Sequence, residues 1–326
     1  MVLAGLDIGT NTFRLLVARI ASSGRLQELH SEQRIIRLGE GLGRNGRLQP
    51  QAMGRAIHAL KAYWVVLEQF KIDAVVAVAT SADREAANGP EFVKAIHEET
   101  GIEVEVISAE EEARRTLLGV LAGFHEAPQS FLVIDVGGGS TEFMWGDRQG
   151  QHGVMSTDLG VVRLTEQYLA LPPVATDGMR GLTRFIQGRL KEVRRTLSMT
   201  PPGGFRPAQL VGTAGTITTL AAIDQRLKVY DPQRIHLHRL GLETVERIYG
   251  ELSAKTPRER LSIPGIEKGR EDLILPGSLI LLLTMRTLGL YEVIVSEYGL
   301  REGILVDYYK KRCREKVKWP PITEGE

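Results

Sequence analysis

Two segments of the chain repeat one pattern at a fixed spacing, and any fold of the chain has to accommodate this repeat. Residues 3–18 read LAGLDIGTNTFRLLVA, and residues 131–146 read FLVIDVGGGSTEFMWG. In each segment an apolar run ends in an aspartate, Asp7 or Asp135, and a turn of small residues leads into a second apolar run. This pattern predicts two strands joined by a hairpin. Because the copies lie 128 positions apart, from Asp7 to Asp135, we expect two domains of one topology that face each other.

The rest of the chain alternates between strand-like and helix-like patterns. In each half, strands come first and alternating helices and strands follow, which predicts an α/β fold with mixed sheets covered by helices. We expect one domain at residues 1–122 and a second at 123–304, with a C-terminal helix at about 305–318 that packs back on the first. Besides the hairpins, the expected strands are 26–37, 73–80, 102–107, 152–157, 208–213 and 292–297. The expected helices are 51–70, one beginning at Asp83, 109–123, 161–170, 176–198, one beginning at Gly215, a helical stretch over 241–290, and a last helix from about residue 300.

Charge and cysteine content exclude several classes of protein. The 41 Lys and Arg residues nearly balance the 40 Asp and Glu residues, which argues against a protein that mainly coats nucleic acid. A single cysteine, Cys313, excludes an internal disulfide framework and fits a reducing compartment. The apolar run at 275–290 contains Pro276, Gly277 and Arg286, so it predicts a buried helix and not a membrane span. With no basic, apolar leader at the N-terminus, we expect a cytoplasmic location.

The two hairpin turns have the composition of phosphate-binding loops. Backbone N–H groups in a glycine-rich turn form a concave anion site, and the missing Cβ lets phosphate oxygens approach closely. An aspartate beside each turn is suited to a divalent cation that bridges phosphates. One such turn is equally well explained as a sharp hairpin, but a pair is harder to explain in that way. A third loop, LVGTAGT at 210–216, ends a strand and begins a helix, where Gly212 and Gly215 favour a further phosphate-facing helix N-terminus.

Three consecutive glutamates begin the predicted helix at 109–123, in the segment SAEEEARRTLLGV. Ser108 is a typical N-cap residue, and acidic side chains in the first turn complement the helix dipole. A glutamate in this position is also suited to act as a general base toward water. The pattern alone does not decide between capping and catalysis for Glu110, Glu111 and Glu112.

Seven motifs, in this order and spacing, resemble the exopolyphosphatase / guanosine pentaphosphate phosphohydrolase family. They are DIGTNTFRLL, IRLGEGL, ATSADREAANG, ISAEEEARRTLLGV, VIDVGGGSTE, VGTAGT and VSEYGLREG. The resemblance extends from residue 3 to about residue 310 and is to the short, two-domain form. It implies the fold of the actin, sugar-kinase and Hsp70 superfamily: two actin-like, ribonuclease H-like domains with mixed five-stranded sheets flanked by helices, and an active-site cleft between them.

The resemblance also implies roles for individual residues. Glu112 matches the catalytic base, Glu142 a second acidic residue that orients water or metal, and Arg84 an arginine that reaches into the cleft. Asp7 and Asp135 match contacts to Mg²⁺. The phosphate-binding residues implied are Thr10, Asn11, Thr12, Gly137, Gly138, Gly139, Ser140 and Thr141, with Gly212, Thr213 and Gly215 in the third loop.

We therefore expect a Mg²⁺-dependent exopolyphosphatase that releases orthophosphate from the end of inorganic polyphosphate. Hydrolysis of guanosine pentaphosphate, an alarmone of the stringent response, uses the same catalytic residues and stays open as an alternative. A kinase would need an acceptor pocket and a true adenosine site, and a non-catalytic nucleotide sensor would not need Glu112 and Glu142. No nucleic-acid or membrane partner is expected, and the resemblance allows a homodimer. The basic residues at 179–195 are interpreted as the solvated face of an amphipathic helix and not as a polyanion track.

Overall fold

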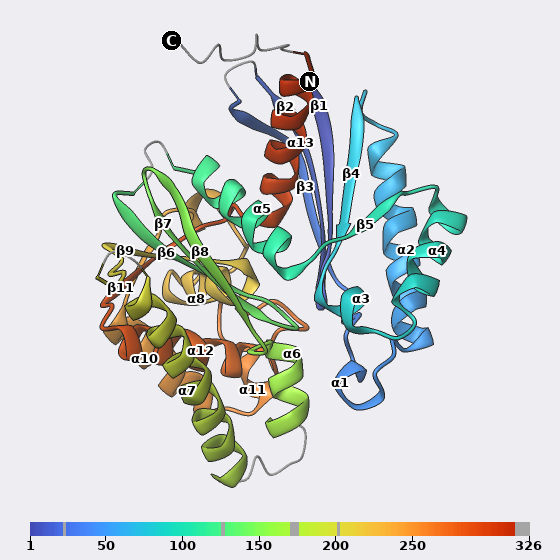
Figure 1. Cartoon of the computed structure of the whole chain (residues 1–326). Coiled ribbons are helices and arrows are strands. Elements are labelled where there is room, and N and C mark those ends of the chain that lie inside the picture. The colour runs from blue at the N-terminus through green and yellow to red at the C-terminus, as the bar shows by residue number, and fades with distance from the viewer. Residues whose placement is uncertain (22–23, 125–127, 170–175, 201–202, 317–326) are drawn as a thin grey trace, which may run out of the picture.

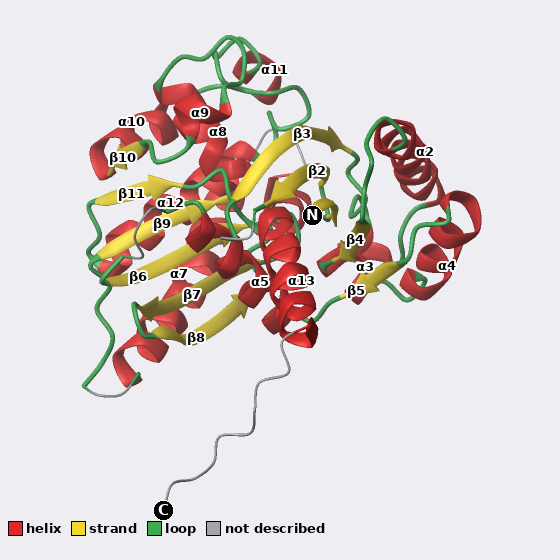
Figure 2. Cartoon of the chain, turned by 90° about the horizontal axis from the view of Figure 1, so that it is seen from above, coloured by secondary structure: helices red, strands yellow, loops and turns green. Residues whose placement is uncertain are grey.

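Each of the two repeated hairpins lies in a sheet of its own in the computed structural model, which describes residues 1–21, 24–124, 128–169, 176–200 and 203–316 (Figures 1 and 2). The first sheet has the strand order β3-β2-β1-β4-β5. Strands β1, β2 and β3 run antiparallel, whereas β4 and β5 run parallel to β1, so the sheet is mixed. Its strands are β1 (Val2–Ile8), β2 (Thr12–Ile20), β3 (Leu26–Ile35), β4 (Ala74–Ala79) and β5 (Val104–Val106).

The second sheet repeats this topology and adds one strand, in the order β10-β11-β9-β6-β7-β8. The expected duplication and the mixed sheets are confirmed, but five strands is wrong for this sheet, which has six. The extra strand β10 contains only three residues and pairs antiparallel with β11 at the edge, so it is too short to give a sequence pattern. The strands are β6 (Ser130–Val136), β7 (Thr141–Asp147), β8 (Gly150–Thr157), β9 (Gln209–Thr213), β10 (Arg239–Gly241) and β11 (Glu292–Val295).

Helices cover the outer face of each sheet. Helices α2 (Pro50–Leu67) and α4 (Gly89–Thr100) pack on the first sheet, and their apolar side chains join one core with the strands. Helices α7, α8, α10 and α12 do the same for the second sheet. The predicted buried helix is confirmed as α12, in which all residues from Ile274 to Met285 are buried. The bounds are α7 (Thr176–Met199), α8 (Ala214–Asp224), α10 (Leu242–Ser253) and α12 (Ile274–Leu288).

Several short elements connect these helices. The helix predicted from Asp83 is divided into α3 (Ser81–Glu85) and α4, because Pro90 lies in the first turn of the second helix, where a proline is tolerated, and a proline cannot continue the first helix. The predicted stretch over 241–290 is divided in the same way, with Pro257 at the start of a short helix of its own. The remaining short elements are α1 (Leu42–Asn45), α6 (Val161–Leu164), the π-helical turn η1 (Thr165–Leu169), α9 (Pro232–Ile235) and α11 (Pro257–Arg260).

Two helices, α5 (Ala109–Ala122) and α13 (Leu300–Lys316), lie side by side between the sheets (Figures 1 and 2). Helix α5 follows the first sheet in the chain, but its apolar residues, such as Leu117, pack on the second. Helix α13 follows the second sheet, and Leu300 and Ile304 pack on the first. Each helix therefore crosses from one domain to the other, and the start of α5 is held between the two sheets.

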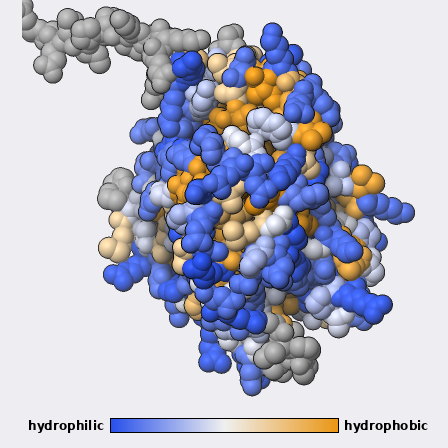
Figure 3. All heavy atoms as spheres, turned by 90° about the vertical axis from the view of Figure 1, so that its right-hand side faces the viewer, coloured by the Kyte–Doolittle hydropathy of each residue, from blue (hydrophilic) through white to orange (hydrophobic). Residues whose placement is uncertain are grey.

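The outer surface is mainly hydrophilic on the face drawn in Figure 3, and its apolar side chains occur in small separate groups. Among the described residues, no helix combines the length and the apolar character needed to cross a bilayer.

Candidate active site

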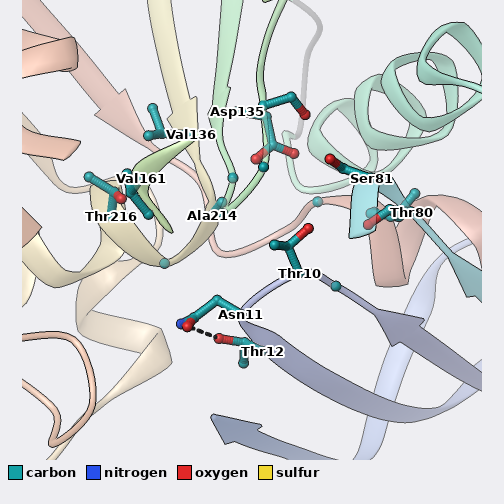
Figure 4. A pocket seen from close by; sticks show the side chains of 18 of the residues that line it. Thr10, Asn11, Thr12, Thr80, Ser81, Asp135, Val136, Val161, Ala214 and Thr216 are labelled. Atoms are coloured by element: carbon teal, nitrogen blue, oxygen red, sulfur yellow. Dashed lines mark hydrogen bonds between the residues drawn. The ribbon is translucent and has the colours of Figure 1, made fainter. Parts of the chain in front are cut away.

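The turns of the two hairpins meet where the sheets face each other, and a cavity lies between them. Gly138 and Gly139 of the second turn lie against Thr10 and Ser81. A Cβ at Gly138 would be 3.0 Å from Thr10 Cβ, and one at Gly139 would overlap the Ser81 hydroxyl, so only glycine permits this approach. Figure 4 shows Thr10 and Asn11 on one side of the cavity and Asp135 on the other.

The third loop forms another wall of the cavity at the N-terminus of α8. Ala214 has a φ of 67°, which is rare for a residue with a side chain and marks a strained turn. The next residue, Gly215, lies directly under the guanidinium group of Arg270, and a Cβ at this position would overlap it. The loop thus places unpaired helix N–H groups and an arginine on the same side of the cavity, which is an arrangement suited to an anion.

Four carboxyl groups gather around the cavity, and all have raised pKa values. Burial raises the pKa of Asp7 to about 6, with repulsion from Asp135 adding to the effect and Arg14 opposing it. Burial, and then the charge of Glu142, raise the pKa of Asp135 to about 7. Burial also raises the pKa of Glu142, against the hydrogen bond that Ser156 Oγ donates to its Oε1 at 2.8 Å. The charges in this cluster are therefore under-neutralised, and a cation would stabilise them.

The structure distinguishes the three glutamates at the start of α5. Glu110 is exposed, and its pKa is lowered by hydrogen bonds from the backbone and from Ser108, as expected for a capping residue. Glu111 binds Arg114 and Arg115 on the far side of the helix. Glu112 alone lines the cavity, with its side chain 13% exposed. Burial and the charge of Glu142 raise the pKa of Glu112 well above its usual value.

Arg84 holds Glu112 in place. Its guanidinium group donates to Glu112 Oε2 at 3.1 Å and to the carbonyl oxygen of Ile107 at 2.9 Å. The hydrogen bond and the positive charge partly oppose the rise in the Glu112 pKa. Arg84 itself is not part of the cavity wall, so in this structure it contacts Glu112 and not the space where a ligand would lie.

Most of the predicted site residues surround the cavity, and a few lie behind its wall. Thr141 Oγ1 donates to the carbonyl oxygen of Leu159 at 2.7 Å and is fully buried. A Cβ at Gly212 would lie 2.7 Å from Ile217, so this glycine allows α8 to pack closely. Glu142 faces Glu112 and Asp135 from behind the wall. The predicted residues that line the cavity are Asp7, Thr10, Asn11, Thr12, Glu112, Asp135, Gly137, Gly138, Gly139, Ser140, Thr213 and Gly215.

Sequence reasoning missed two arginines in the cavity wall. Arg14 Nη1 lies 3.9 Å from Asp7 Oδ2. The repeat contained a signal for this residue, because Arg14 faces Asp7 across the first hairpin as Glu142 faces Asp135 across the second. Arg270 is 9% exposed, pairs with Glu267 at 3.2 Å, and has a pKa lowered first by burial and then by Arg14. It lies in a loop with no motif, so no pattern indicated it. Thr80 and Ser81, where β4 leads into α3, also line the cavity.

Comparison with known proteins agrees with this geometry. The Ppx/GppA phosphatase family matches residues 16–312. The chain is 33% identical to Exopolyphosphatase 2 of Mycobacterium tuberculosis over 316 residues, which cover 92% of this chain and 96% of the relative. The crystal structure of the family member from Aquifex aeolicus matches with a TM-score of 0.79 at 33% identity, over 96% of this chain and 98% of the other. An exopolyphosphatase from Cytophaga hutchinsonii matches with a TM-score of 0.87 at 29% identity, over 95% and 98%. The fold is therefore the actin-like fold, and the chain belongs to the Ppx/GppA phosphatase family.

Proposed function

We propose that this protein is an exopolyphosphatase, which hydrolyses the terminal phosphoanhydride bond of inorganic polyphosphate and releases orthophosphate. The observation that carries the proposal is the position of Glu112, which lines a cavity walled by two facing glycine-rich turns and is held by Arg84. Family members at 26–33% identity that are named exopolyphosphatases support the same reaction.

The residues of the cavity can supply what this reaction needs. Phosphoryl transfer to water requires positioning and charge stabilisation more than covalent chemistry from the protein. The backbone N–H groups of the two turns would bind the terminal phosphates, and Arg14 and Arg270 would neutralise their charge. Glu112 would orient a water molecule and take its proton as the water oxygen attacks the terminal phosphorus. The bridging P–O bond then breaks, and the shortened chain leaves with the electron pair.

The raised pKa of Glu112 fits the role of a base. A carboxylate with a pKa above its usual value accepts a proton more readily than an unperturbed one, and the Arg84 hydrogen bond favours its ionised form. The two effects act in opposite directions on the Glu112 pKa, and the rise caused by burial is the larger one.

We propose that Asp7 and Asp135 hold Mg²⁺ together with substrate and water. Within the described residues, no group of three His, Cys, Asp or Glu side chains is arranged to hold a metal ion. Mg²⁺ fits such a site, because it is often bound by one or two carboxylates and completes its coordination with water and phosphate oxygens. The two aspartates repel each other and both have raised pKa values, so a cation would relieve the repulsion. When bound, the ion would supply charge neutralisation for the phosphates.

The substitution Glu112→Gln tests the role of Glu112. We expect the variant to lose about a thousandfold in kcat, the scale of general-base contributions, whereas the Kd for tripolyphosphate stays within about twofold. The matched control is Glu110→Gln, which removes an exposed glutamate from the same helix turn and should keep near wild-type turnover. Near wild-type turnover in Glu112→Gln would contradict the assignment. Phosphate release from guanosine pentaphosphate, measured in parallel, ranks the two substrates, and a higher kcat/KM for the nucleotide would change the proposed substrate.

A further inference from the structure

Positive charge is concentrated on helix α7, on the outer side of the second domain (Figure 1). The helix contains six Arg and Lys residues and two carboxyl groups, whereas the net charge of the whole chain is only +1. The rest of the chain is therefore slightly acidic. One side of α7 packs on the second sheet, where Leu182, Ile186 and Leu190 are fully buried. The opposite side of the helix faces solvent.

Four cations form a narrow row along this solvent side, which we call the α7 stripe. They are Arg180, Arg184, Lys191 and Arg195, and all four are exposed. Because each residue of an α-helix turns by about 100° around the axis, these four positions lie within about 60° of one another. With a rise of about 1.5 Å per residue, the row is about 22 Å long. The stripe is thus straight and one cation wide.

The stripe has little counter-charge. Arg180 lies 3.7 Å from Asp177, and both side chains are more than half exposed. The other three cations of the stripe have no carboxylate partner in the part of the chain that the structure describes. The second carboxyl group of α7, that of Glu192, pairs with Arg189 at 3.2 Å, away from the stripe.

The arrangement of these cations is unfavourable for the helix itself. Their exposure agrees with the solvated face that the sequence predicts, but solvation does not require them to share one narrow row. Opposite charges four positions apart stabilise a helix, and like charges at this spacing destabilise it. The unfavourable spacing occurs twice in the stripe, once at each end. An anion bound along the stripe would relieve this repulsion, and nothing in the packing of α7 does so.

We infer that the α7 stripe binds polyphosphate, at a segment of the chain away from its reacting end. A linear polymer with a negative charge on every unit matches a straight row of cations, and its binding releases counterions. A membrane surface fits less well, because the apolar side of α7 is buried in the core and cannot insert. A single-stranded nucleic acid fits less well, because the one aromatic residue of α7, Phe185, lies under Arg189 and offers no free stacking surface.

The choice of polyphosphate as the ligand rests on the proposed function. A chain held by one segment on α7 stays near the protein, so the local concentration of its ends around the central cavity rises. This effect does not depend on which way the chain runs between the two sites. Tripolyphosphate is too short to occupy the stripe and the cavity together, so the stripe acts on long chains.

The test is the triple variant Arg184→Gln, Lys191→Gln and Arg195→Gln, in which glutamine keeps a high helix propensity. Its affinity for long-chain polyphosphate is measured by titration calorimetry, with Glu112→Gln present in both proteins to limit turnover. At about 50 mM salt we expect the affinity to fall roughly tenfold or more, because about three phosphate contacts are lost. The slope of log Kd against log salt should decrease by about 2, at roughly 0.7 for each contact to a flexible single chain. The Kd for tripolyphosphate should stay within about twofold, because the central cavity is unchanged.

The matched control removes the same charge from exposed positions elsewhere, with Arg19→Gln, Lys71→Gln and Arg258→Gln. A loss in the control as large as that in the α7 variant would show an effect of net charge alone and would overturn the inference. An unchanged long-chain affinity in the α7 variant, or an equal loss for tripolyphosphate, would overturn it as well. So would a loss of binding to anionic lipid vesicles or to a DNA duplex with none for polyphosphate, because the stripe would then serve another partner.

Failure of the proposed function looks different from failure of this inference. In that case the wild-type protein with Mg²⁺ releases no phosphate from polyphosphate of either length. The binding comparison between the α7 variant and its control still decides whether the stripe holds the polymer.

Discussion

Asp83 is a buried carboxyl group that takes no part in the proposed reaction. It is 3% exposed, and in the described part of the chain neither carboxylate oxygen has a hydrogen-bond partner. Burial raises the pKa of Asp83 to about 7. The folded protein therefore keeps a proton that the unfolded chain releases above about pH 4, so this group lowers stability as the pH rises toward 7. We expect Asp83→Asn to reduce the loss of unfolding free energy between pH 5 and 8 by roughly 2 kcal/mol, measured by urea denaturation without Mg²⁺.

The slope of unfolding free energy against pH is compared between wild type and Asp83→Asn. The difference isolates Asp83, because every other titrating group is common to both proteins. A wild-type and a variant curve that run parallel between pH 5 and 8 would show that Asp83 is ionised in the folded state. The substitution Asp73→Asn is the control, because it makes the same chemical change at an exposed site, where Asp73 accepts a hydrogen bond from the Val2 N–H.

Single residues of the site differ in how far sequence predicted them. The hairpin residues and Glu112 belong to motifs, and the structure brings them to one cavity. The three consecutive glutamates, Glu110 to Glu112, did not show by themselves which one is the base, because capping and catalysis both need an acidic side chain in the first turn. Only the family resemblance indicated Glu112. Arg270 had no signal at all, since its place over Gly215 depends on how a loop 55 positions later in the chain folds back.

At the scale of elements, the crossing of α5 and α13 joins Glu112, the proposed base, to both sheets. The helices touch backbone to backbone, because a Cβ at Gly303 would overlap the carbonyl oxygen of Arg115 and one at Gly119 would overlap that of Gly299. We expect Gly303→Ala to destabilise the protein by about 2 kcal/mol or more, since a packed interface has to separate. Its matched control is Gly250→Ala in α10, where nothing lies within 4 Å of the added Cβ and stability should rise by up to about 1 kcal/mol. Equal effects of the two substitutions in thermal unfolding would rule out the close crossing.

Most helices and strands were predictable from the sequence, and the errors in the other predictions have physical causes. Strands of five or more residues with an apolar face were expected close to where they occur. Strand β10 was missed because three residues do not establish a period. The helix expected from Asp83 was too long because Pro90 was not taken as a second helix start. The packing of α5 on the second sheet is a tertiary contact. The apolar periodicity of α5 shows that one face is buried but not which sheet covers it.

At the scale of the whole molecule, ion pairs join the two domains beside the cavity. Arg37 donates to both carboxylate oxygens of Asp272, at 2.7 and 3.0 Å, and to the carbonyl oxygen of Gly269 at 3.1 Å. The partners are 235 positions apart, so no local pattern predicts the pair. Gly269 and Asp272 lie on either side of Arg270, and the pair therefore ties the segment that carries Arg270 to the first domain.

This pair predicts that Arg37 and Asp272 act as a unit in substrate binding. We expect Arg37→Ala and Asp272→Ala each to raise KM for tripolyphosphate about fivefold, the equivalent of roughly 1 kcal/mol for a partly exposed ion pair, with less change in kcat. The double variant should resemble either single one, because both substitutions remove the same interaction. Arg239→Ala is the control, since its ion pair with Glu292 lies within one sheet. If the rise in KM of the double variant equals the product of the two single effects, the residues act separately. An unchanged KM in both single variants would mean that substrate binding does not depend on this ion pair.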